Sequence, residues 1–453
     1  MPKGAVMAVL LAAAIVPRQS RAQAPAATAD VAVNDSVDTD DAPLPTGVDA
    51  AALEQRLAQS EALVRNSQPT VQLGGYVDLG FFVPQGDGAG YVEDFGHFYF
   101  PQYDPVLYPG LGFGWVFLGD ILAPVVNTRG EVADLGPAPG VTRYDSINSR
   151  GAPGFIANEV NLALRSALTP SALVSASINF TPRTGRDFAL GDAFDVDLAQ
   201  VEWLPGESQR TSLFVGKTEP VFGIEYRDRK SDRRFGITPS LIARYTTGTA
   251  LGIKLRTKLG HNDWLVVALA LTNGSNTTEQ FHFYDEIDSN AGKTGSGRLA
   301  VRLPHDIEVG VSGSYGPQDR TTDTEHAMWF VGPDVLAHLG RVDVKGQWLK
   351  GRSAGQAAQG AYGLDLKGGG YLELDVMWTP SFGMLGRGEY RDAFVWLSDQ
   401  RAYLTKSWRA TFGLRWVLTP RAVVKAEYLH NGEYGGIPKI ANDILTSSLV
   451  MGF

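Results

Sequence analysis

Residues 371–378 read Tyr-Leu-Glu-Leu-Asp-Val-Met-Trp, and this stretch decides the class of fold. In an extended chain Leu372 and Leu374 fall on one side, while Glu373 and Asp375 fall on the other. One apolar face and one charged face, alternating with a period of two residues, indicate a β-strand that lies between a hydrophobic medium and water.

The same alternation recurs along much of the sequence after residue 69, in segments of about ten residues, which suits a tilted strand that crosses a membrane. The polar faces carry full charges, which would be costly in the core of a soluble sandwich but not beside water. Open sheet edges are excluded in hydrocarbon because their backbone groups would lack partners. The sequence therefore predicts an all-β, transmembrane antiparallel β-barrel. The further alternating stretches are 253–259, 342–348, 409–418 and 445–453.

Connections between these stretches alternate between short turns and long polar segments, which is typical of an outer-membrane barrel. Seven short turns with both termini on the same side predict about 16 strands, with 14 or 18 as alternatives. Long connections are expected at 84–154, 218–248, 274–293 and 353–369. The short turns are expected at 169–171, 205–210, 260–262, 304–306, 340–341, 380–381 and 419–421.

The N-terminal residues predict export. Lys3 precedes an apolar run from Ala5 to Val16, which is too short to span a bilayer but suits the core of a signal peptide. Small residues at 22–24 predict a signal peptide over residues 1–24, with a competing cleavage site at 24–26.

Three further segments complete the predicted domain organisation. Residues 25–47 are rich in Ala, Asp and Pro and predict an acidic flexible linker. Residues 48–68 predict a short periplasmic helix, because apolar positions recur at three- and four-residue spacing. This spacing fits either a coiled coil or an amphipathic helix that packs on another surface. Residues 69–453 form the predicted barrel.

Composition and motifs exclude several functions. The protein has 453 residues, no Cys and a net charge of −9, which argues against disulfides, thiolate metal sites and a nucleic-acid partner. No zinc-protease, nucleophile-elbow or phosphate-loop motif occurs. No cofactor is implied and the protein is predicted not to be an enzyme. A hydrolase with catalytic residues spread over loops, or a non-conducting anchoring barrel, are the alternatives from other classes.

Several stretches resemble bacterial outer-membrane porins, most of all the phosphate-selective porin O and P family. The resemblance implies a water-filled channel in the outer membrane of a Gram-negative bacterium, with both termini in the periplasm and a homotrimeric assembly. It also implies that the third external loop folds into the lumen. The stretches that carry it are Gln72–Asp78, Phe214–Tyr226, Thr249–Leu255, Val424–Tyr428 and Leu449–Phe453.

The third external loop, 218–248, is rich in cations, with six Lys and Arg against four acids. Arginines on a segment that narrows a pore attract anions, so passive diffusion of small hydrophilic solutes with an anion preference is expected. A weakly selective or sugar-conducting pore is the alternative. The predicted constriction residues are Arg227, Arg229, Lys230, Arg233, Arg234 and Arg244, and the predicted basic strip of the wall is Lys254, Arg256 and Lys258.

The first long loop, 84–154, is rich in aromatic residues. Packing over the barrel mouth or against a neighbouring subunit is the favoured interpretation, and a surface that stacks on sugar rings is the alternative.

Overall fold

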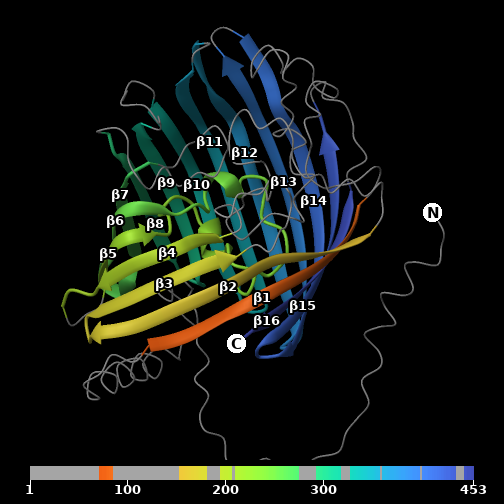
Figure 1. Cartoon of the computed structure of the whole chain (residues 1–453), viewed down its shortest axis with the longest axis horizontal. Helices are drawn as coiled ribbons and strands as arrows, with labels where there is room; N and C mark the ends of the chain where they lie inside the picture. Colours follow the sequence, from red (N-terminus) through yellow and green to blue (C-terminus); the bar gives the residue numbers. More distant parts are fainter. Residues whose placement is uncertain are drawn as a thin grey trace, which may run out of the picture. The chain divides into compact units, whose positions relative to one another are not determined.

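The computed structural model describes residues 71–84, 153–180, 194–206, 210–274, 292–317, 327–357, 360–397, 400–434 and 443–453. They form one closed barrel in which every strand pairs antiparallel with its neighbours in sequence and β1 pairs with β16 (Figure 1). This confirms the predicted barrel and its 16 strands. The predicted signal peptide, linker and helix before residue 69 lie outside the described residues, as does nearly all of the aromatic first loop.

The barrel wall consists of sixteen strands. The strands are β1 (Val71–Pro84), β2 (Gly154–Thr169), β3 (Ala172–Phe180), β4 (Phe194–Trp203), β5 (Thr211–Thr218), β6 (Ala250–Leu259), β7 (Leu265–Thr272), β8 (Thr294–Leu303), β9 (Ile307–Pro317), β10 (Ala327–Leu339), β11 (Val342–Ala357), β12 (Gly360–Thr379), β13 (Phe382–Leu397), β14 (Gln400–Thr419), β15 (Ala422–Glu433) and β16 (Ile444–Gly452). Three short 3-10 helices accompany them, namely η3 (Glu225–Asp228), η4 (Ala243–Tyr245) and η5 (His261–Asp263).

Each of the seven predicted short turns joins two consecutive strands, from β2–β3 to β14–β15. The barrel also begins and ends at this turn side, because Tyr76 near the start of β1 pairs with Gly452 at the end of β16.

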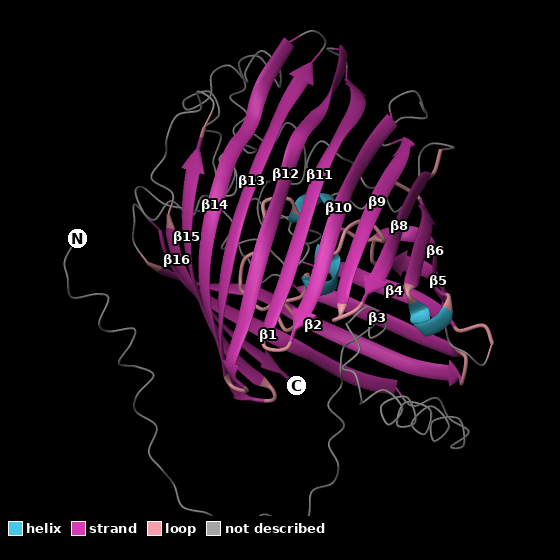
Figure 2. Ribbon diagram, turned by 180° about the vertical axis from the view of Figure 1, so that it is seen from behind, coloured by secondary structure: helices cyan, strands magenta, loops and turns pink. Residues whose placement is uncertain are grey.

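The predicted long loop at 353–369 is wrong. β11 continues to Ala357 and β12 begins at Gly360, so most of this segment is strand and the connection is short. The segment is rich in Gly, and a β-bulge near Lys367 interrupts the pairing, so the period of two is hidden there. β11–β14 consequently form a tall part of the wall, as Figure 2 shows.

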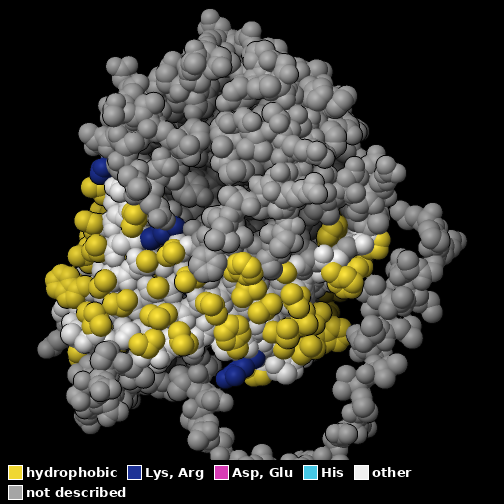
Figure 3. All heavy atoms as spheres, in the orientation of Figure 1, with side chains coloured by type: hydrophobic (Ala, Val, Ile, Leu, Met, Phe, Trp, Pro, Cys, Tyr) yellow, Lys and Arg dark blue, Asp and Glu magenta, His cyan; other side chains and the backbone are white. Residues whose placement is uncertain are grey.

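The two faces of the wall differ as the alternation predicts. On β12, Leu372 is 53% exposed on the outside, whereas Glu373 is 6% exposed on the inside. Hydrophobic side chains form a broad band over the outer face seen in Figure 3. Among the described residues no helix is both long and apolar enough to cross a membrane.

Most of the aromatic side chains that are exposed on the described outer wall lie in two rows. We call the row near the short turns the turn-side aromatic row: Trp203, Trp264, Trp378, Trp416 and Phe453. We call the row nearer the opposite ends of the strands the loop-side aromatic row: Tyr315, Trp329, Trp348, Tyr390, Trp408 and Tyr428. Two aromatic girdles that flank an apolar band are characteristic of membrane barrels.

Candidate functional site

Residues 219–249, which we call the inserted loop, connect β5 to β6 and lie inside the barrel. The Gly223 backbone N–H donates to Ser312 Oγ on β9 at 3.0 Å, and the Ile224 N–H donates to Gln347 Oε1 on β11 at 3.0 Å. The inward folding implied by the resemblance is therefore confirmed, and Figure 2 shows short helices within the ring of strands.

Lys425 of β15 binds the backbone of the inserted loop. Its buried ammonium donates to the carbonyl oxygens of Ser231 at 2.5 Å, Arg234 at 2.5 Å and Gly236 at 2.9 Å. A loop inside a barrel has no sheet ladder of its own, so its buried backbone groups need other partners. A wall lysine supplies them here, and three neutral oxygens rather than a carboxylate surround its charge.

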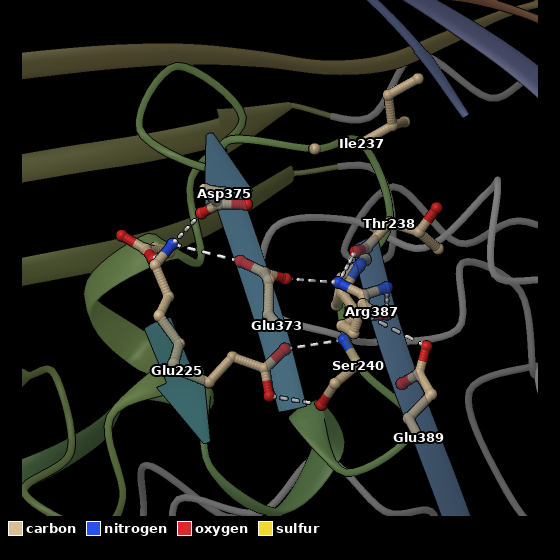
Figure 4. Close-up of polar contacts among 12 residues, drawn as sticks. Glu225, Ile237, Thr238, Ser240, Glu373, Asp375, Arg387 and Glu389 are labelled. Atoms are coloured by element: carbon tan, nitrogen blue, oxygen red, sulfur yellow. Dashed lines mark hydrogen bonds and ion pairs between the residues drawn. The ribbon is translucent and has the colours of Figure 1, made fainter. Parts of the chain in front are cut away.

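Arg387 of β13 also binds the backbone of the inserted loop, further along the chain. Its guanidinium donates to the Thr238 carbonyl oxygen at 2.9 Å and to the Pro239 carbonyl oxygen at 3.2 Å. It also pairs with Glu373 and Glu389, each at 3.1 Å (Figure 4). Wall charges on β12 and β13 thus hold the inserted loop and neutralise one another.

Glu225 joins the two arms of the inserted loop. Its carboxylate accepts hydrogen bonds from the Ser240 backbone N–H at 2.7 Å and from Ser240 Oγ at 2.6 Å (Figure 4). Burial raises the pKa of Glu225 to about 7, and the nearby charge of Glu389 adds to the rise, while the Ser240 hydrogen bonds and Arg387 oppose it. This carboxyl group therefore changes charge near neutral pH.

Apolar contacts fix the loop as well. Phe330 of β10 points inward and is buried, with its ring centroid 6.5 Å from that of Phe222 and 5.4 Å from that of Tyr245. Ile242 lies against Gly369 of β12, where an added Cβ would come within 2.7 Å of Ile242 Cγ2. The inserted loop is packed against the wall by a small core of its own.

Two predicted constriction residues are held in ion pairs. The buried Arg229 guanidinium binds both carboxylate oxygens of Asp197 on β4: Nη1 donates to Oδ1, and Nη2 donates to Oδ2 at 2.7 Å. Its Nε also donates to Glu219 Oε1 at 3.2 Å. Arg227 binds Glu308 on β9 at 3.2 Å. These contacts give both arginines carboxylate partners within the barrel wall and the loop.

The cations of the turn at 230–234 are paired less fully than Arg227 and Arg229. Lys230 is only 2% exposed, and its ammonium has no ion-pair partner among the described residues. In Arg234, Nε and Nη1 are buried and lack a hydrogen-bond partner among those residues. Arg233 is half-buried in the same turn and has a partner. Arg244 lies in η4, and its side chain is outside what the structure describes.

The predicted basic strip lies on β6. Lys254 and Arg256 are buried and face inward, and the Lys254 ammonium lies 4.3 Å from the ring centroid of Phe214. Arg256 donates to the Tyr226 hydroxyl at 3.4 Å, so it also contacts the inserted loop. Lys258 is half-buried nearer the short turn.

Charge is distributed unevenly inside the barrel. Lys345 of β11 is surrounded by the carboxylates of Asp228, Glu373 and Asp375 at 2.5, 3.2 and 3.1 Å. Around the 230–234 turn, by contrast, Lys425 binds carbonyl oxygens. Carboxylates therefore compensate Lys345, whereas the 230–234 turn carries Lys230, Arg233 and Arg234 against one acid of its own, Asp232.

Asp334 of β10 is a buried inward acid that the sequence did not single out. It receives hydrogen bonds from the Arg298 guanidinium at 2.6 and 3.0 Å. The alternation of outward Trp329 and Val331 could have indicated it. Inward apolar Phe330 obscured that pattern. No cluster of metal-ligating side chains occurs within the described ranges.

Comparison with known proteins bears on the fold. No protein-family model matches the sequence, and no curated protein matches it. The outer membrane channel DcaP of Acinetobacter baumannii aligns with a TM-score of 0.53 at 10% identity, over 85% of this protein and 98% of DcaP. The anion-selective porin from Comamonas acidovorans gives a TM-score of 0.48 at 10% identity, over 85% of this protein and 100% of that porin. OmpF of Salmonella typhi gives 0.49 at 10% identity, over 86% of this protein and 99% of OmpF. At such identities the likeness to DcaP establishes a shared barrel fold.

Proposed function

We propose that the protein is an outer-membrane channel through which small hydrophilic solutes, preferably anions, diffuse passively. The observation that carries the proposal is a closed barrel with an apolar outer wall, charged inward faces and a loop fixed inside it. Full charges inside a barrel are favourable beside water and fixed charges there act on passing ions.

The outer wall supports a membrane location. Leucine, valine and tryptophan side chains are exposed along the strands, and aromatic rows lie on both sides of this apolar band. Such a surface would be unfavourable in water but suits lipid flanked by two interfaces. If the short turns lie on the periplasmic side, as in bacterial barrels, the start of β1 and the end of β16 both face the periplasm.

The 230–234 turn supports the anion preference. Of the predicted constriction set, Lys230 and Arg234 lack carboxylate partners among the described residues, whereas Arg227 and Arg229 are paired. Uncompensated cations on a segment inside the lumen lower the energy of an anion that passes. We assign selectivity to this turn, supported by the basic strip of Lys254, Arg256 and Lys258.

A homotrimer in contact with outer-membrane lipid completes the proposal, on the strength of the resemblance in sequence. Cross-linking and native mass spectrometry of the purified protein test it directly. A mass of a single protomer alone under mild detergent conditions would contradict it.

Stepwise conductance in a planar bilayer tests the channel itself. The purified full-length protein is expected to insert and give discrete ohmic steps. The many contacts of the inserted loop also favour a second function, a plugged barrel with an anchoring role. Correct insertion, shown by heat-dependent gel mobility, without any conductance would support that function and overturn the channel.

A further inference from the structure

The inner wall of β2–β4 carries amide side chains with free hydrogen-bonding atoms. Asn161 of β2 lies directly opposite Asn179 of β3, and its Nδ2 donates to Asn179 Oδ1 at 2.5 Å. Their other amide atoms, Asn161 Oδ1 and Asn179 Nδ2, are buried and have no hydrogen-bond partner among the described residues. One free acceptor and one free donor are therefore left on neighbouring strands.

Gln200 of β4 is buried with its whole amide unpaired. The side chain is 3% exposed, and neither Oε1 nor Nε2 has a hydrogen-bond partner in the described part of the chain. Its neighbours in the register are Ser175 of β3, which has a short side chain, and Gly216 of β5, which has none. Ala199 and Val201 are exposed on the outer face, so the Gln200 amide points into the barrel.

These side chains follow one line along the inner wall. The line, which we call the amide row, consists of Asn161, Asn179, Ser177, Ser175 and Gln200, and its two ends are about 13 Å apart because four residues of β3 separate them. Buried polar groups normally have hydrogen-bond partners, and a group without one lowers stability. The amide row is therefore unfavourable unless a further molecule binds to it.

The chemistry of the amide row suits hydroxyl groups. A hydroxyl both donates and accepts a hydrogen bond, and an amide offers one atom of each kind. Two hydroxyls on neighbouring carbons of a solute can therefore bond to the free oxygen and the free nitrogen at the same time. A neutral amide gives a simple ion less stabilisation than a charged side chain does, so the row favours hydroxylated solutes.

The turn at 230–234 of the inserted loop begins beside the amide row. Ser177 Oγ donates to Asp197 Oδ2 at 3.1 Å, and Arg229 Nη2 donates to the same oxygen at 2.7 Å. Two positions further on, the Ser231 carbonyl oxygen accepts from Lys425 of β15. Because β4 and β15 hold residues so close in sequence, the turn passes in front of the strands between them, which are β16 and β1–β3.

We propose that the amide row and the cations Lys230 and Arg234 together bind polyhydroxylated carboxylates, the chemical class of the sugar acids. The carboxylate pairs with the cations of the turn, and the hydroxyl groups bond to the amides. Two amide positions along the wall suit conduction, because a solute must leave each position as well as enter it. This inference rests on the proposed anion-preferring channel and names a class of solute for it.

The test is block of the chloride current through the purified full-length protein in a planar bilayer. The added solutes are gluconate, propionate and sorbitol. Gluconate is expected to block at the lowest concentration, because it alone carries both a carboxylate and a run of hydroxyl groups. Gln200→Met and N161L/N179L keep the size of the side chains but remove the amides. Each is expected to raise the half-blocking concentration of gluconate roughly fivefold and to leave that of propionate unchanged.

A control variant on another part of the wall makes this result specific. Thr411 of β14 is also buried with an unpaired hydroxyl, and Thr411→Val is expected to leave block by gluconate unchanged. Equal block of Gln200→Met and the unmodified protein by gluconate would overturn the site. Block by propionate or sorbitol at the same concentration as gluconate would also overturn it, because one of the two recognised groups would then play no part.

Chemical modification tests the same site without relying on lost hydrogen bonds. The protein has no Cys, so Gln200→Cys introduces a single thiol. A small thiol reagent is expected to modify it from the lumen, and gluconate, but not propionate, is expected to slow the reaction. A thiol that never reacts, or that reacts equally fast with gluconate present, would contradict the proposal. Failure of the proposed function is seen separately, as absent conductance or a cation-selective potential in the unmodified protein.

Discussion

The Lys425 ammonium lies 2.5 Å from the backbone carbonyl oxygen of Arg234, which joins the barrel wall to the turn of the inserted loop. A wall cation that could have faced a solute therefore holds the loop backbone in place. The Arg234 side chain, in turn, keeps two nitrogens without hydrogen-bond partners among the described residues. The cations inside the barrel therefore have two roles: Lys425 anchors the loop, and we assign to Arg234 the attraction of anions.

Lys425→Met is expected to loosen the inserted loop. The variant keeps the length of the side chain but removes donors to three carbonyl oxygens. Leaving buried carbonyl groups without a partner costs about 1–3 kcal/mol of stability. Denaturant unfolding measures the loss, and single-channel recording is expected to show larger current fluctuations. Lys258→Met, at a half-buried position, is the control, and an equal effect there would contradict the anchoring role.

Gly236→Ala is expected to disturb a neighbouring contact between the wall and the inserted loop, the one that Glu427 of β15 makes with Ile237. An added Cβ would lie 2.0 Å from Glu427 Oε1, the oxygen that accepts the Ile237 N–H at 2.6 Å. Glu427 must then move, and we expect a loss of about 1–3 kcal/mol. Gly386→Ala on β13 is the matched control, because its Cβ would meet nothing within 4 Å. Thermal unfolding of both variants measures this loss. Gly236→Ala is expected to melt at a lower temperature than Gly386→Ala, and equal melting temperatures would refute the prediction.

Anion preference is expected to rise as the pH falls through about 7. The pKa of Glu225 is raised to about 7, so the carboxyl is neutral below that pH and the inserted loop gains positive charge. The free energy of unfolding is also expected to rise as the pH falls, because the folded protein binds the Glu225 proton more tightly than the unfolded protein does. This stabilisation is fully present below 4.5, the ordinary pKa of a glutamate, and is lost as the pH rises through about 7.

Glu225→Gln tests this pH dependence. The zero-current potential in a salt gradient is measured on both sides of neutrality. The variant keeps a Ser240 contact but has no proton to lose, so its potential is expected to stay constant where that of the unmodified protein shifts. An unchanged shift in the variant would assign the titration to another group.

Local pattern was enough to predict much of the barrel. The alternation of Leu372 and Leu374 with Glu373 and Asp375 depends only on neighbouring residues, and the structure places both faces as expected. The short turns followed from their Pro, Gly and Asn residues in the same way. The segment 353–369 failed because its Gly residues and bulge remove the local signal.

The interior could not be predicted in this way, because its contacts join residues far apart in sequence. Phe330 faces inward against the rule of polar lumens because Phe222 and Tyr245 pack on it. Likewise Lys425 and Arg387 look like pore cations in the sequence, yet they bind the backbone of a loop about 150 or more residues away. The contacts of the folded loop are needed to tell the cations that anchor its backbone from the cations that lack carboxylate partners.

The most direct test of the account is the zero-current potential of the purified protein in a planar bilayer under a salt gradient, measured beside the K230Q/R234Q variant. We predict a potential of the sign set by chloride, reduced toward zero or reversed in the variant. R341Q/R421Q, which removes two exposed cations from short turns, is expected to leave it unchanged. A cation-selective potential in the unmodified protein would contradict the account and assign control of the pore to its carboxylates.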